Sequence, residues 1–184
     1  MSREEKRYLI EVHVAGTCFR KKNGIAQVLV AKRSQNKELY PGKWECGGGQ
    51  IHFGENFKDA VKREMKEEFG VIVKKVIPFS VYSIPVDKIL QKKIPGLRCI
   101  CEWDGYVNGK GPKIDPKDFS EWRWQPISKL DEIDFISGIA EDTKRAWENY
   151  SMEKNCGKIN KLIMKDKIFS MIHSGSGKIS LAVE

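Results

Sequence analysis

The N-terminal part of the chain alternates apolar and polar residues in two neighbouring segments. Residues 7–20 and 25–34 both show this alternation, and Asn23-Gly24 lies between them. A period of two is typical of β-strands, and Asn-Gly favours a tight hairpin turn. We therefore expect these two segments to form a β-hairpin.

The hydrophobic period changes after a glycine-rich segment that contains Gly47, Gly48 and Gly49. Between Asn56 and Phe69 the apolar residues recur at spacings of three and four, at positions 57, 60, 61, 65 and 69. This spacing places them on one face of an α-helix. Gly70 follows as a helix stop. The pattern predicts an amphipathic helix over 56–69.

Three later segments are rich in β-branched and aromatic residues, at 71–85, 97–107 and 121–126. Such residues favour strands. Helical spacing returns over 131–152, and again within 158–174. We predict one α/β domain with a mixed sheet over 1–153. Residues 154–184 would form a C-terminal helical extension, packed on the domain or on a partner.

Charge and cysteine content narrow the setting. The 184 residues carry 33 basic and 25 acidic side chains, a net charge of +8. Such an excess favours encounter with polyanions without choosing among nucleotides, RNA and other phosphates, and a solvated basic surface remains an alternative. Five cysteines at no zinc-ligand spacing, and an N-terminus without a signal-peptide core, indicate a reducing cytoplasm. No apolar run approaches the ~20 residues of a membrane span.

Three glutamates crowd one side of the predicted helix. Glu64, Glu67 and Glu68 lie at i, i+3 and i+4, where like charges oppose helix formation. A hard cation such as Mg²⁺ takes carboxylate oxygens and would offset this repulsion. Acidic pairs on helix surfaces are also common, so a solvated ridge is the alternative. Glu55 lies eight residues before Arg63, close enough for an ion pair that orients the helix.

The segment from Gly49 to Val71 resembles the Nudix box. That motif is a glycine, five residues, a glutamate, seven residues, and then Arg-Glu-apolar-x-Glu-Glu-x-Gly-apolar. The chain matches it at Gly49, Glu55, Arg63, Glu64, Met65, Glu67, Glu68, Gly70 and Val71. Every specified position matches, over about an eighth of the chain. The flanking hairpin and later strands are similar to the rest of a Nudix domain.

The resemblance implies an α/β/α sandwich and a hydrolase of substrates in which a nucleoside diphosphate is linked to another group. Glu64, Glu67 and Glu68, with the Gly49 carbonyl, would hold Mg²⁺ or Mn²⁺. Glu55 would support Arg63, which would orient the helix as part of the catalytic set. A first candidate substrate is a nucleoside triphosphate or an oxidised nucleotide.

The resemblance leaves several roles open. The general base would be Glu64 or a carboxylate outside the box, for which Asp118 and Glu121 are candidates. Arg33 would face phosphates, and Trp44 is one of several aromatic residues available for stacking on a base. An RNA 5′-end pyrophosphohydrolase, an idle nucleotide-binding module and a homodimer also remain possible.

The chain departs from the family pattern at Gly47, where the family usually has a proline. The segment 32–45 also resembles the branch that contains isopentenyl diphosphate isomerase. In that alternative Cys46 would be a catalytic cysteine. Because the isomerase departs from the strict box that this chain keeps, we favour the hydrolase.

Overall fold

The computed structural model describes residues 11–87 and 92–154, and the predicted helix within 158–174 lies outside them. The chain divides into two compact units, Met1–Trp147 and Glu148–Glu184. All features discussed below belong to the first unit, except the last residues of the helix at 139–154. The predicted boundary between 153 and 154 stays a prediction. Among the helices of the described residues, none has the length and hydropathy needed to cross a membrane.

The predicted hairpin is confirmed. β1 (His13–Lys22) and β2 (Ile25–Arg33) pair antiparallel, with Lys22 opposite Ile25 across the Asn23-Gly24 turn. Both turn residues have positive φ, 51° at Asn23 and 80° at Gly24, as the tight turn requires. The strand segments predicted further on are also present as β5 (Val71–Asp87), β6 (Lys92–Tyr106) and β7 (Phe119–Pro126).

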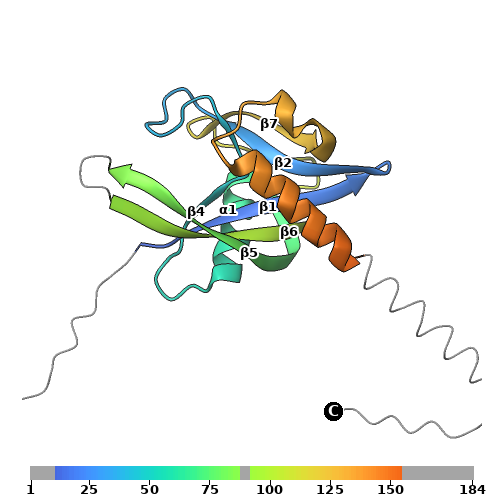
Figure 1. Ribbon diagram of the computed structural model, residues 1–184, viewed down its shortest axis with the longest axis horizontal. Coiled ribbons are helices and arrows are strands. Elements are labelled where there is room, and N and C mark those ends of the chain that lie inside the picture. Colours follow the sequence, from blue (N-terminus) through green and yellow to red (C-terminus); the bar gives the residue numbers. More distant parts are fainter. Residues whose placement is uncertain (1–10, 88–91, 155–184) are drawn as a thin grey trace, which may run out of the picture. The chain divides into compact units, whose positions relative to one another are not determined.

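The seven strands form one mixed sheet (Figure 1). Its main order is β3-β2-β1-β6-β5, where β3 is Trp44–Glu45, and β7 pairs with β2. β1 and β6 are parallel, whereas the other pairs are antiparallel. The short β4 (Gly48–Gln50) also pairs with β1. The glycine-rich segment, expected as a loop, therefore contributes two short strands.

One edge of β1 is shared by two partners. Residues 19–22 of β1 pair with β2, and residues 13–15 pair with β4. β2 and β4 therefore diverge from a common edge. We call this divergence the β1 fork, and the pocket described below opens beside it.

Helix α1 (Phe57–Phe69) covers one face of the sheet. Its buried residues, Ala60, Val61, Met65 and Phe69, join a core that includes Val14, Cys18, Cys99 and Cys101 of the sheet. Gly16 permits the close approach, because a Cβ there would lie 2.7 Å from the Met65 sulfur. The other face of β1 carries Phe19, whose ring meets Trp147 edge to face at 5.4 Å. The fold is the predicted α/β/α arrangement.

The helix predicted over 131–152 begins later than expected. A short 3₁₀ helix, η1 (Ile127–Glu132), comes first, and the α-helix starts at residue 139. Between them the chain is held extended beside β3: Trp44 N–H donates to the Asp134 carbonyl, and Ile136 N–H donates to the Trp44 carbonyl. Gly138, at φ 84°, then turns the chain into the helix.

Candidate active site

Helix α1 begins and ends where its sequence specifies. The Asn56 side chain accepts hydrogen bonds from the backbone N–H of Lys58 and Asp59, both at 3.0 Å. Gly70 is left-handed at φ 63°, and its N–H donates to the Lys66 carbonyl. The apolar face of α1 is turned into the core. The acidic residues of α1 are therefore directed to solvent and to Gly47, Gly48 and Gly49, which we call the glycine turn.

Arg63 connects helix α1 to Glu55 in the loop before it and to Gln50 at the end of β4. Its Nε and Nη2 donate to the two oxygens of Glu55 at 3.0 and 2.9 Å. Nη1 donates to Glu64 at 2.6 Å and to Glu67 at 3.1 Å, and Nη2 also donates to the Gln50 carbonyl at 2.9 Å. The hydrogen bonds with Glu55, followed by those with Glu64 and Glu67, raise the pKa of Arg63 above its usual value. The expected Glu55–Arg63 pair is therefore present.

The glycine turn meets the C-terminal half of α1. Gly48 N–H donates to Glu68 Oε2 at 2.7 Å. Gly49 lies against Glu64 so closely that a Cβ at Gly49 would be 2.4 Å from the carboxyl carbon of that side chain. Glycine at these positions allows two carboxylates of the helix to reach the backbone of β4.

Glu68 is half-buried and lies near other carboxylates. Burial raises its pKa well above the usual value, and the charges of Glu45, Glu64 and Asp118 raise it further, against the opposing hydrogen bond from Gly48. The charges of three other carboxylates thus act on Glu68. A cation there would relieve their repulsion, and carboxylate oxygens are the ligands that Mg²⁺ prefers.

The predicted metal ligands are only partly gathered. Within residues 11–87 and 92–154, no group of three His, Cys, Asp or Glu side chains is arranged to hold a metal ion. Arg63 pairs with both Glu64 and Glu67, and the Glu67 side chain is 58% exposed. The carboxylate oxygens of these residues are nevertheless the ligands that Mg²⁺ prefers. Coordination by Gly49, Glu64, Glu67 and Glu68 remains a prediction.

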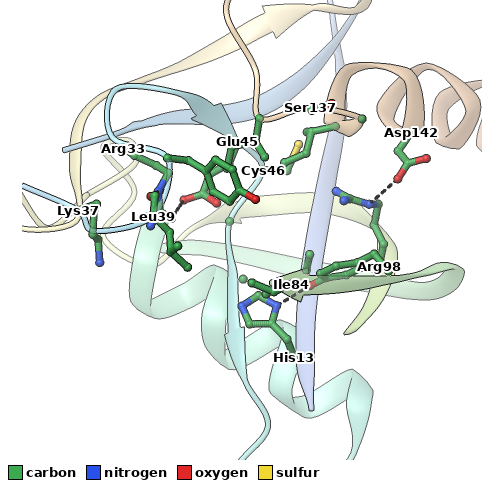
Figure 2. Close-up of a pocket in the computed structure, with 18 of the residues that line it drawn as sticks. His13, Arg33, Lys37, Leu39, Glu45, Cys46, Ile84, Arg98, Ser137 and Asp142 are labelled. Carbon is green, nitrogen blue, oxygen red and sulfur yellow. Dashed lines mark hydrogen bonds and ion pairs between the residues drawn. The ribbon is translucent and has the colours of Figure 1, made fainter. Parts of the chain in front are cut away.

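A pocket of about 480 Å³ lies beside the glycine turn, and Gly47 and Gly48 are part of its lining (Figure 2). Glu68 and Glu45 line it, together with two basic residues, Arg33 at the end of β2 and Lys37 in the segment after it. Arg33 donates to Glu45 at 2.7 Å and to the Leu39 carbonyl at 2.8 Å. Lys37 pairs with Asp118. The pocket thus has a charged end next to the box glutamates.

The other end of the pocket is formed by the sheet and by the segment that leads into the helix at 139. His13 of β1, Tyr82 of β5 and Arg98 of β6 line it, with isoleucine side chains between them. Figure 2 shows Arg98 directed toward Asp142 and His13 below Ile84. His13 Nδ1 and the Tyr82 hydroxyl are 2.5 Å apart.

Two of the predicted substrate and base residues lie outside this pocket. Trp44 is 4% exposed and does not line it; the Arg123 guanidinium lies 4.2 Å from the Trp44 ring centroid. Glu121 is paired with Arg123 at 2.9 Å on β7 and is also not a lining residue. Arg33 and Asp118, by contrast, both line the pocket, and their roles stay predictions.

Cys46 lines the pocket but is only 1% exposed. Its sulfur lies 3.7 Å from the Thr143 hydroxyl. Burial raises the pKa of the thiol, so the thiolate that a nucleophilic role requires is disfavoured. This environment is that of a packing residue.

Sequence reasoning missed Glu45, His13, Arg98 and Asp142 as pocket residues. No local motif marks them, because they come together only through the parallel pairing of β1 with β6 and through the chain that passes over β3. A strand partner that lies more than 80 residues away leaves no periodic signal. Glu45 alone had a local indication, since it adjoins the glycine-rich segment.

The fold and site define a class: an α/β/α protein with an acidic helix beside a glycine turn and a pocket of about 480 Å³. A family model, the NUDIX domain, matches residues 11–145. The chain belongs to the Nudix family.

Named relatives match only part of the chain. The nucleoside triphosphatase NudI of Escherichia fergusonii is 35% identical over 54 residues, which is 28% of this chain and 38% of that protein. An uncharacterized Nudix hydrolase of Yersinia pestis is 36% identical over 50 residues, 27% of this chain and 28% of the relative. The matched stretches therefore span well under half of these relatives.

Solved structures match over more of the length at lower identity. The NUDIX domain of Shewanella oneidensis NrtR, crystallised with ADP ribose, superposes with a TM-score of 0.63 at 16% identity, covering 81% of this chain and 94% of that one. A C. elegans Ap4A hydrolase gives a TM-score of 0.60 at 16% identity, covering 78% and 99%. These likenesses establish the fold.

Proposed function

We propose that the chain is a Mg²⁺-dependent pyrophosphohydrolase, with Mn²⁺ as a substitute, that cleaves a diphosphate bond in a nucleoside diphosphate linked to another group. The first candidate substrate is a nucleoside triphosphate, canonical or oxidised. The observation that carries the proposal is the meeting of Glu64 and Glu68 with the glycine turn, beside a pocket of about 480 Å³.

The proposed metal ligands are the Gly49 carbonyl, Glu64, Glu67 and Glu68. A bound divalent ion would neutralise diphosphate oxygens and lower the pKa of water. The acidic crowding around Glu68 supports this assignment, because burial and neighbouring carboxylates disfavour its charge unless a cation is present.

Other residues of the chain would bind and orient the substrate. Arg33 and Lys37 lie at the charged end of the pocket and can donate to phosphate oxygens once they leave Glu45 and Asp118. Asp118 then becomes free to accept a proton, which makes it a better candidate base than the exposed Glu121. Glu64 stays an alternative base.

The named relatives support a nucleotide substrate. One is called a nucleoside triphosphatase, one neighbouring structure contains ADP ribose, and another is an Ap4A hydrolase. The common element of these ligands is a nucleoside joined to two or more phosphates. RNA as substrate, homodimer formation and a cytoplasmic location remain predictions from the sequence.

The test is metal-dependent product release from a panel of nucleoside triphosphates, oxidised nucleotides, nucleotide sugars, dinucleoside polyphosphates and 5′-triphosphate RNA. We expect Glu67→Gln to lower kcat at least about a hundredfold in Mg²⁺, because it removes a charged metal ligand. Glu132→Gln is the matched control, since Glu132 is similarly exposed and pairs only with Lys129 among the described residues. Equal activity of the two variants, or no hydrolysis by a folded sample, would contradict the proposal.

A further inference from the structure

Arg98 is a buried cation with few partners. It is 5% exposed, lies on β6 and lines the pocket. In the described part of the chain its ion pair is with Asp142, 3.4 Å from Nε to Oδ2, and its Nε is sealed from solvent without a hydrogen bond. Buried charged groups normally make hydrogen bonds, because an unmade one is costly. A side chain that keeps this charge beside a pocket is suited to bind a ligand there.

Strand register sets the distance between Arg98 and the box. Ala15 pairs with Gly48 on one side and with Arg98 on the other. Neighbouring strands lie about 4.8 Å apart, so the backbone of Arg98 is two strand spacings, about 10 Å, from Gly48 and its bound Glu68. The Arg98 side chain is paired with Asp142, whereas Glu68 is held at Gly48, so the two residues line different parts of the pocket.

The Arg98 guanidinium packs against the ring of Tyr82. Its Cζ lies 5.2 Å from the centroid of the Tyr82 ring, and the Tyr82 hydroxyl is bonded to His13. His13 stays neutral at neutral pH, since burial and then the charges of Arg98 and Arg33 lower its pKa to about 4. The Tyr82 ring thus packs against the Arg98 guanidinium, and the neutral His13 adds no second positive charge beside it.

The chemistry around Arg98 favours a neutral, planar ligand. Asp142 stands beside it, so an anionic group would approach a carboxylate as closely as a guanidinium. A ring that presents acceptors next to an N–H donor would satisfy both residues. The lining of the same pocket also includes the apolar side chains of Ile84, Ile94, Ile136 and Ile139. This combination of an apolar slot and a polar edge is typical of a nucleobase site.

Among nucleobases, guanine presents O6 and N7 as adjacent acceptors that match the two-pronged donor of arginine. Adenine carries an amino group in place of O6 and would oppose Arg98. We propose that this end of the pocket binds a 6-oxopurine base, guanine or hypoxanthine, with Arg98 donating to O6 and N7 and Asp142 accepting from ring N–H. The inference rests on the proposed function, because it takes the substrate to be a nucleotide.

The test is calorimetric binding of GMP, IMP, AMP, CMP and UMP to the full chain in EDTA, which does not depend on hydrolysis. We expect GMP and IMP to bind at least tenfold more tightly than the other three. Arg98→Met and Asp142→Asn should both abolish that preference. Arg98→Lys should abolish it too, since lysine keeps the charge but lacks the planar pair of donors.

Arg145→Met is the matched control. Arg145 also pairs with Asp142, but its side chain is 63% exposed and does not line the pocket, so this variant should keep the preference. Thermal unfolding of each variant identifies any that fails to fold. If Arg98→Met fails to fold, Arg98→Lys or Asp142→Asn replaces it. Arg98→Met, Arg98→Lys and Asp142→Asn should each raise the KM for GTP with little change in kcat.

Equal binding of all five nucleotides, tightest binding of AMP, CMP or UMP, or a preference that survives Arg98→Lys and Asp142→Asn would overturn the inference. These results are distinguishable from failure of the proposed function. A guanine preference in binding without metal-dependent hydrolysis would overturn the proposed function alone. Hydrolysis without base preference would overturn the role of Arg98 alone.

Discussion

Gly48 and Gly49 are adjacent in β4, but a side chain at each would meet different atoms. At Gly48, φ is 147° and a Cβ would lie 2.1 Å from the Val14 carbonyl oxygen. At Gly49 the three atoms nearest to a Cβ would all belong to the carboxylate of Glu64, at 2.4–2.5 Å. A backbone carbonyl in a paired strand cannot yield, whereas a carboxylate can rotate away.

We therefore expect the two alanine variants to separate stability from activity. Gly48→Ala should lower the free energy of unfolding by about 2–4 kcal/mol, because it strains the backbone of β4 against β1. Gly49→Ala should change it by less than about 1 kcal/mol but lower kcat/KM at least about tenfold, since it displaces Glu64. Urea unfolding and nucleotide hydrolysis measure the two effects. Similar losses of stability in both variants would contradict this distinction.

Individual residues were predictable where a local motif fixed their spacing. The Glu55–Arg63 pair followed from eight residues that span a helix start and two turns. Trp44 shows the limit: an aromatic residue after a strand has the same sequence pattern whether it stacks on a ligand or, as here, packs in the core. Only the path of the chain around it distinguishes the two.

Among the elements, α1 was the best predicted, because its apolar period and its glycine stop agree; its Asn56 cap is seen only in the structure. Asn56 caps the backbone N–H groups at the start of the helix. We expect Asn56→Ala to lower the free energy of unfolding by about 1 kcal/mol, measured in urea, since it removes these bonds. Lys58→Ala, an exposed change in the same turn, is the control and should have little effect. An effect of Asn56→Ala no larger than that of Lys58→Ala would rule out a stabilising cap.

The segment 131–152 shows why an element boundary can be missed. Its apolar spacing fits a helix throughout, yet residues 134–136 are extended because their backbone pairs with Trp44. Bonds to a strand about 90 residues away replace the local helical bonds. Periodicity describes which residues face the core, and it does so here, but it does not reveal a competing strand partner.

At the scale of the whole molecule, His13 joins strands that are far apart in sequence. It lies on β1, opposite Gly96 of β6, and its bond to Tyr82 crosses to β5. Gly96 permits the crossing, because a Cβ there would lie 2.4 Å from the Tyr82 ring. Nothing in the sequence indicates this contact between residues 69 positions apart.

The lowered pKa of His13 makes stability depend on pH. Burial lowers its pKa from 6.5 to about 4 in the folded chain, so the unfolded chain binds the proton more readily between these values. The contribution of neutral His13 to the free energy of unfolding is fully present above pH 6.5. It is lost as pH falls toward 4, by up to about 3 kcal/mol. We expect His13→Asn to flatten this dependence in urea unfolding at pH 7.5, 6 and 5. His52→Asn, at an exposed site, should keep it, and parallel curves for wild type and His13→Asn would exclude the linkage.

The β1 fork has a consequence for how such a protein can change over generations. The glutamates are anchored by α1 and by β4 on one branch, whereas Arg33 ends β2 on the other branch and Lys37 follows it. Substitutions or insertions in residues 34–43 can reshape what the pocket accepts without moving the helix that carries the box. The reaction and the choice of substrate are thus held by separate supports, so a lineage can acquire a new substrate while its hydrolytic chemistry is inherited intact.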